Sequence, residues 1–215
     1  MKHLYQAKNI GLFVALVGIV VMAGWVFDIQ ILKSILPTWV TMKFATALSF
    51  LLSGVSLYYI CEVINRKSEI GQMVIIFTTL GLVLLMGMLL ISNLTGIQLG
   101  IESLFVKEAA GAVKTTVPGR PSFGTMVSFM LITFAGFVVI WQGKGIDVWL
   151  RIIGILVALF GGLAIIGYMI DMPLLYYTLE GFSTAMAMHT AILFVLMGVG
   201  LMLIGKPQLS GTSAG

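Results

Sequence analysis

The chain has 215 residues, of which 60% are hydrophobic and only 9% are charged, and its formal net charge is +4. Soluble domains carry roughly 25% charged residues, so this composition excludes an ordinary soluble enzyme, a disordered tail and a fibrous repeat. The basic residues are scattered, with no run longer than Arg66-Lys67, which argues against a nucleic-acid partner. A single cysteine, Cys61, excludes a disulfide framework. The mean hydropathy of +1.11 indicates a polytopic membrane protein.

Six apolar stretches are long enough for a helix to cross a hydrocarbon core about 30 Å thick. They run over about 10–27, 42–61, 72–92, 123–141, 152–170 and 184–204. The first follows Lys2 and Lys8 as in a signal peptide, but its length favours a permanent helix. Seven Lys and Arg residues lie on the side of the N-terminus and five on the other side. We therefore expect a plasma-membrane protein with both termini in the cytoplasm.

The even-numbered stretches share the pattern Thr-x3-Phe-x3-Gly/Thr. It comprises Thr46, Phe50 and Gly54, then Thr125, Phe129 and Thr133, then Thr190, Phe194 and Gly198. Residues four apart share a helix face, so each set forms either a packing seam or the lining of a ligand pocket. We predict an all-α membrane protein whose six transmembrane helices form three repeated hairpins with pseudo-threefold symmetry. The repeats cover about 10–67, 71–143 and 147–205 of a single domain at 1–205, and 206–215 is a short cytoplasmic tail.

Three short motifs resemble the N-terminal membrane regions of bacterial and archaeal sensor histidine kinases and diguanylate cyclases. They are LGIESLF at 99–105 with PGRPS at 118–122, GY at 167–168 with PLLY at 173–176, and FSTAMAMHTA at 182–191. The resemblance implies membrane sensing or signal input, without naming a ligand. The chain departs from that family at 124–126, which read GTM, and no output region follows the last span. It is either the membrane part of a longer receptor or a free-standing relative that works through a partner.

The candidate ligand-binding residues are the few polar and aromatic groups near the non-cytoplasmic rim. They are Trp25, Asp28, Lys43, Arg120, Tyr168, Asp171 and His189. Asp28 and Asp171 occupy equivalent positions, and are either wet interfacial residues or a converging pair for a cation or an amine. Lys43 either snorkels outward or pairs with one of those aspartates.

Two further residues of this set also leave alternatives open. His189 either hydrogen-bonds within the bundle, ligates haem or a metal, or senses pH. His3, the other histidine, is expected on the opposite side, which weakens a haem site within one chain. Arg120 is expected to pair with Glu102 or Glu180.

The longest loop, 93–122, is predicted to hold a short amphipathic helix over about 97–108 that covers the bundle. No catalytic motif occurs in the sequence. The leading hypothesis is a non-enzymatic sensory or signal-input module that contacts the lipid bilayer and a protein partner or a second copy. The alternative is an accessory subunit of a larger membrane complex, which binds a lipid or a cofactor such as haem or quinone. A small transporter ranks last, because the span midplanes are almost free of charge.

Overall fold

The protein is all-helical, and its structure, a computed structural model, describes residues 2–36, 38–66, 68–109, 111–143, 145–177 and 184–205. The tail expected at 206–215 and Glu180 lie outside the described residues. In chain order the helices are α1 Lys2–Val26, α2 Gln30–Lys33, α3 Phe44–Arg66, α4 Glu69–Leu82, the π-helical turn η1 Val83–Gly87, α5 Met88–Thr95, the 3₁₀ turn η2 Ile101–Ser103, α6 Phe123–Trp141, α7 Ile146–Met169, α8 Leu174–Tyr177 and α9 Met188–Ile204.

Five of these segments are long and apolar enough to cross a membrane. They are Lys2–Val26, Phe44–Asn65, Glu69–Thr95, Phe123–Trp141 and Ile146–Met169. The sixth expected span, 184–204, is helical only from Met188, because 184–187 run extended before α9. Its 17 residues give a length of about 26 Å, somewhat less than a typical hydrocarbon core. The helices are those of a multi-pass membrane protein.

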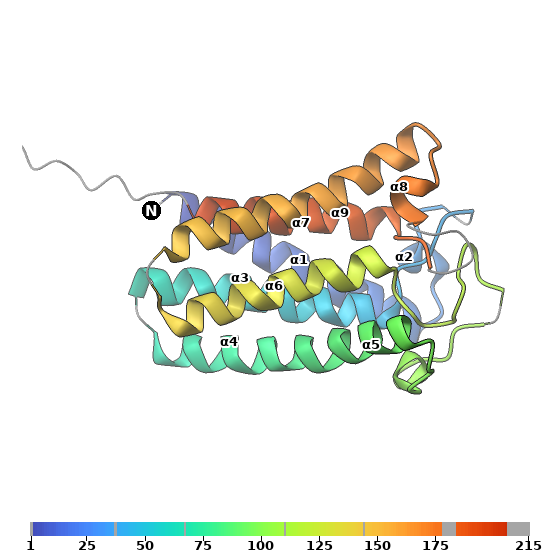
Figure 1. The fold of residues 1–215 in the computed structure, drawn as a ribbon, viewed down its shortest axis with the longest axis horizontal. Helices are drawn as coiled ribbons and strands as arrows, with labels where there is room; N and C mark the ends of the chain where they lie inside the picture. The colour runs from blue at the N-terminus through green and yellow to red at the C-terminus, as the bar shows by residue number, and fades with distance from the viewer. Residues whose placement is uncertain are drawn as a thin grey trace, which may run out of the picture.

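The long helices lie side by side in an elongated bundle with two different ends (Figure 1). At one end α1 begins and α9 ends, and the Arg151 guanidinium donates to the Gly205 carbonyl over 2.8 Å. We call this the opposite end. The other end gathers α2, α8, the loop 96–122 and the segment 184–187 (Figure 1). We call it the loop-rich end.

Helices α1 and α3 pack as hairpin 1, α4 to α6 as hairpin 2, and α7 and α9 as hairpin 3. Hairpins 1 and 3 are closed by facing glycines. A Cβ on Gly54 would lie 2.6 Å from the backbone nitrogen of Ala15, and one on Gly198 would lie 2.7 Å from that of Ala158. Such distances leave no room for a side chain, so these glycines allow the two helix backbones to approach closely.

The same two hairpins also match where the chain turns at the loop-rich end. Asp28 and Asp171 both adopt left-handed backbone geometry, with φ of 55° and 50°. They stand directly after α1 and α7, where a left-handed residue ends a helix. The Met42 amide then donates to the Lys33 carbonyl over 2.9 Å, and the Met186 amide donates to the Tyr176 carbonyl over 2.8 Å.

Three phenylalanines fill the middle of the bundle. Phe50 of α3, Phe129 of α6 and Phe194 of α9 are each fully buried. Their ring centroids lie 4.8, 4.9 and 4.9 Å apart, in tilted and edge-to-face arrangements that aromatic pairs prefer. One helix of every hairpin therefore contributes a ring to one shared cluster.

Hairpin 2 differs from the other two in its first helix and in its loop. The π-helical turn η1 interrupts the run from α4 to α5, as a bulge of one extra residue does. The prediction of an amphipathic helix at 97–108 is wrong, since only the single 3₁₀ turn η2 forms there. Gly96 and Gly100 adopt left-handed φ values of 71° and 77°, and this geometry stops a right-handed helix.

Candidate functional site

The loop 96–122 is organised by a tight turn at Val117 to Arg120. The Arg120 amide donates to the Val117 carbonyl over 3.1 Å, and Gly119 has φ of 77°. Proline at the second turn position and a left-handed glycine at the third are the residues that a type II turn requires. A Cβ on Gly119 would overlap the Glu102 carbonyl, so glycine also permits this close contact. The turn thereby holds Glu102 beside Arg120.

A buried ion pair within the loop bonds to hairpin 2 through Ser92. Arg120 Nη2 lies 3.0 Å from Glu102 Oε1, and the two side chains are 7% and 6% exposed. The hydroxyl of Ser92, on α5, lies 2.5 Å from the same carboxylate oxygen and 2.8 Å from Arg120 Nη2. Burial alone would raise the pKa of Glu102, but the hydrogen bonds from Ser92 and Arg120 outweigh it and lower that pKa.

A second buried ion pair joins the loop to hairpin 1. Lys43 Nζ lies 2.5 Å from Glu108 Oε1, and the side chains are only 2% and 5% exposed. Lys43 also donates to the Thr115 hydroxyl over 2.8 Å. The other carboxylate oxygen of Glu108 accepts from the Gly119 amide over 2.7 Å. Each charge is therefore both paired and hydrogen-bonded, as burial requires.

The two ion pairs flank a small enclosed space. It is lined by Trp25, Phe44, Ala45, Glu102, Phe105, Val106, Glu108 and Gly119. Its volume of about 10 Å³ is close to the smallest that holds one water molecule. Ring stacking of Phe105 on Phe44, with centroids 5.4 Å apart, closes one wall. The charges of the two ion pairs sum to zero, and the space between them is nearly closed. One glutamate of each pair, Glu102 or Glu108, lines this space.

The loop reaches hairpin 3 through Lys114. Its ammonium donates to the Tyr176 hydroxyl over 2.7 Å, and its carbonyl accepts from the Ala185 amide over 3.1 Å. The Tyr176 ring stacks on Tyr168, with centroids 4.2 Å apart. The ring of Trp39, in the connection after α2, contacts the Tyr168 ring, with centroids 5.2 Å apart. This polar and aromatic cluster ties the loop and hairpin 1 to hairpin 3.

Trp25 and Tyr168, both predicted site residues, occupy matching anchoring positions. The Trp25 indole donates to the Met42 carbonyl over 2.8 Å, and the Tyr168 hydroxyl donates to the Met186 carbonyl over 2.8 Å. Each bond pins the extended segment before α3 or α9 onto the preceding long helix. Trp25 also lines the enclosed space.

The predicted aspartates do not meet in the structure. Asp28 pairs with Lys33, Nζ to Oδ1 2.6 Å, and its side chain is 92% exposed; the hydrogen bond from Lys33 lowers the pKa of Asp28. Asp171 is also exposed. Lys43 neither snorkels nor binds either aspartate, since its buried ammonium pairs with Glu108. Both aspartates are thus solvent-exposed residues at helix ends.

His189 lies in the first turn of α9. Both its ring nitrogens are buried, and neither has a hydrogen-bond partner among the described residues. His3 lies at the start of α1, at the opposite end of the bundle (Figure 1), so the two histidines cannot share a haem iron. No group of three His, Cys, Asp or Glu side chains fit to hold a metal ion occurs in the part of the chain that the structure describes.

Arg120 is paired with Glu102, one of its two expected partners. Four further members of the site were not predicted from the sequence: Ser92, Glu108, Lys114 and Tyr176. The signal for them was present in the Pro118-Gly119 turn, because a turn there folds the loop back on itself. The turn alone does not determine which loop residue contacts which helix, because those contacts depend on long-range packing.

Comparison of the chain with protein-family models, with curated proteins and with solved structures gives no match. The resemblance to the membrane regions of sensor kinases and cyclases therefore remains a prediction.

Proposed function

We propose that the protein is a non-enzymatic signal-input module of the plasma membrane, which receives its stimulus at the loop-rich end. The observation that carries this proposal is that one loop bonds to all three hairpins, through the buried side chains of Glu108 and Arg120 and through the exposed Lys114. Glu108 bonds to hairpin 1, Arg120 to hairpin 2 and Lys114 to hairpin 3. A change in this loop would therefore act on all three hairpins at once.

The proposal includes an arrangement of three repeated hairpins and six spans around a pseudo-threefold axis. The shared cluster of Phe50, Phe129 and Phe194 supports it, because these residues occupy the same position of the sequence pattern. The paired glycine contacts of hairpins 1 and 3 also support it. Both termini are proposed to face the cytoplasm, on the count of basic residues, which places the loop-rich end outside.

The mechanism is a two-state shift of the loop. Breaking one buried ion pair leaves an uncompensated charge at a cost of about 3–5 kcal/mol, so the loop is held firmly until something replaces a partner. A stimulus that binds the carboxylate of Glu108 or Glu102 better in the open state would shift the population of the two states. The hairpins, released from their common tie, would then repack and carry the change along α9 to a cytoplasmic partner.

Spin-label distance measurements test this coupling. Labels are placed at Ile70 and Val148, which are 70% and 52% exposed near the opposite end, in a Cys61→Ala background reconstituted in lipid nanodiscs. Glu108→Gln is expected to broaden or displace the distance distribution between the labels. Lys107→Gln changes an exposed charge next to it in the same loop and is the matched control.

Unchanged distributions in both Glu108→Gln and Glu102→Gln would refute the coupling. Isolation of the native protein with stoichiometric membrane subunits, together with unchanged distributions, would favour the accessory-subunit alternative.

A further inference from the structure

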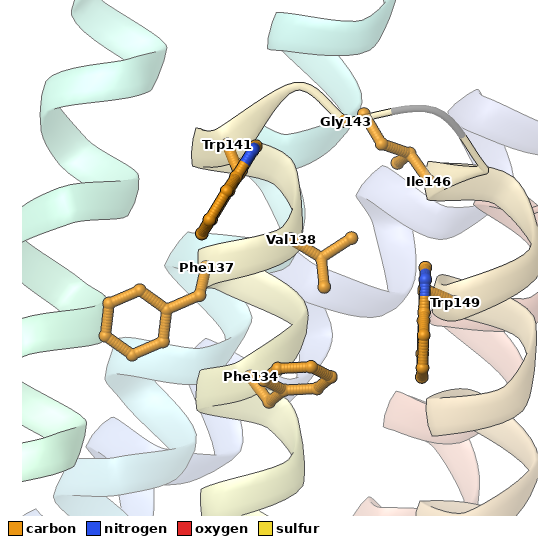
Figure 2. A pocket seen from close by; sticks show the side chains of 7 residues that line it. All are labelled: Phe134, Phe137, Val138, Trp141, Gly143, Ile146 and Trp149. Atoms are coloured by element: carbon orange, nitrogen blue, oxygen red, sulfur yellow. The ribbon is translucent and has the colours of Figure 1, made fainter.

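A second hollow lies at the other end of the bundle, between α6 and α7. It has a volume of about 310 Å³ and is lined by Phe134, Phe137, Val138, Trp141, Gly143, Ile146 and Trp149. Figure 2 shows the two tryptophans on either side of the groove, with Val138 between them. The groove shares no residue with the loop-rich end, so an inference about it is independent of the proposed function.

The groove lies where α6 ends and α7 begins. Gln142 and Gly145, which cap these two helix ends, both adopt left-handed geometry, with φ of 51° and 81°. A Cβ on Gly143 would touch only Trp141, at 3.6 Å, and one on Gly145 would touch nothing within 4 Å. The corresponding ends of α3 and α4 pack more closely, since a Cβ on Gly71 of α4 would lie 2.8 Å from the Val63 side chain of α3.

The walls of the groove are apolar and accessible from the side of the bundle. Phe137, Trp141 and Trp149 are 50%, 86% and 47% exposed. In Figure 2 both indole nitrogens lie at the end of the ring nearer the connection between the helices. Neither indole has a hydrogen-bond acceptor among the described residues. An occupant would thus meet hydrocarbon surface along the groove and two N–H donors at its rim, where tryptophans of membrane proteins meet lipid headgroups.

We propose that this groove holds one acyl chain of a bilayer phospholipid, whose ester or phosphate oxygens accept hydrogen bonds from Trp141 and Trp149. The volume is at the low end of the roughly 300–1,000 Å³ that small-molecule sites occupy. A second copy of the chain would need roughly 800 Å² of buried surface on each partner, far more than seven lining residues present.

The shape of the wall also selects a flexible chain over a flat ring. Phe134 and Trp149 meet edge to face, with an interplanar angle of 88° and centroids 5.9 Å apart. These two rings are not parallel, so they cannot sandwich the flat headgroup of a quinone. A polymethylene chain has no preferred face, so it can lie against this edge-to-face pair of rings through dispersion contacts.

Native mass spectrometry of the full chain, extracted in a mild detergent, tests the site. The wild type is expected to retain one phospholipid per chain after delipidation. Val138→Phe fills the groove from its floor and should lower the retained fraction at least about tenfold. Ile76→Phe adds the same ring to an exposed position of α4 (45% exposed) and is the control that should retain the lipid.

A fluorescence measurement keeps the test decisive if Val138→Phe fails to fold. Phosphatidylcholine with brominated chains is titrated into the protein in detergent, where it should exchange with the retained lipid, quench tryptophan emission and reach saturation at about one bound lipid per chain. Trp141→Phe/Trp149→Phe should lose the saturable part of the quenching, because only Trp25 and Trp39 remain. Equal lipid retention in Val138→Phe, a retained mass that is a quinone or a second chain, or quenching without saturation would overturn the proposal.

Discussion

The ion pair between Lys43 and Glu108 gives the sharpest energetic prediction. Its partners are 2% and 5% exposed, so neither charge can recover hydration when the other is removed. We expect Lys43→Met and Glu108→Gln each to lower the free energy of unfolding by about 3–5 kcal/mol. The double variant leaves no stranded charge and should cost no more than either single variant. The coupling energy is then about 3 kcal/mol or more.

The assay is reversible unfolding in mixed detergent micelles, followed by circular dichroism, for the wild type and the three variants. The pair of Lys33 and Asp28 is the matched control, because Lys33 is also buried (8% exposed) but its partner Asp28 is 92% exposed, and a carboxylate in water contributes little to such a pair. Lys33→Met and Asp28→Asn should therefore show weak coupling. Additive effects of the Lys43 and Glu108 substitutions would refute the assignment of a buried, mutually dependent pair.

Three further predictions concern glycine packing, pH and helix termination. Gly54→Ala and Gly198→Ala should each lower the free energy of unfolding by about 1–3 kcal/mol, because the added methyl group overlaps a facing backbone. Gly162→Ala, with nothing within 4 Å of its Cβ, should be neutral or stabilising in the same micelle unfolding assay. Equal stability of all three variants would contradict the close approach of the helices. The pKa of Glu102 is lowered in the folded protein. The ionised carboxylate therefore stabilises the fold fully above the pKa of an unfolded glutamate, and this stabilisation is lost as the pH falls through the folded pKa. The free energy of unfolding between pH 6 and pH 3 should accordingly depend less on pH in Glu102→Gln than in the wild type. Asp171→Gly should raise the thermal midpoint slightly, since glycine adopts the left-handed φ of 50° without steric cost; a lower midpoint would show that the carboxylate itself stabilises the turn.

The helices could be predicted from the sequence largely because lipid imposes length and hydropathy on each of them. The stretch at 123–141 coincides with α6, and the pattern of Phe50, Phe129 and Phe194 identified the residues that meet in the core. Helix ends were less predictable. The extended residues before α9 are held by a bond between the Met186 amide and the Tyr176 carbonyl, which no local propensity encodes.

The candidate site could be predicted only in part, for a related reason. Trp25 and Tyr168 were predicted as aromatic groups near the rim, and in the structure they make matching hydrogen bonds. Lys43 was recognised as unusual, but its partner Glu108 lies 65 residues away in a loop. Charge within an apolar layer shows that a partner must exist, while only the folded loop determines which residue it is.

The π-helical turn at Val83–Gly87 determines in which direction the side chains of the following helix α5 point around the helix axis. In a regular α-helix each residue advances the phase by 100°, so rewinding the bulge into regular α-helix with all its residues kept would rotate Ser92 by about that angle. Its hydroxyl, now 2.5 Å from the Glu102 carboxylate, would then point towards another neighbour. A single backbone irregularity thus dictates which side chain meets the loop about one and a half turns further along the helix.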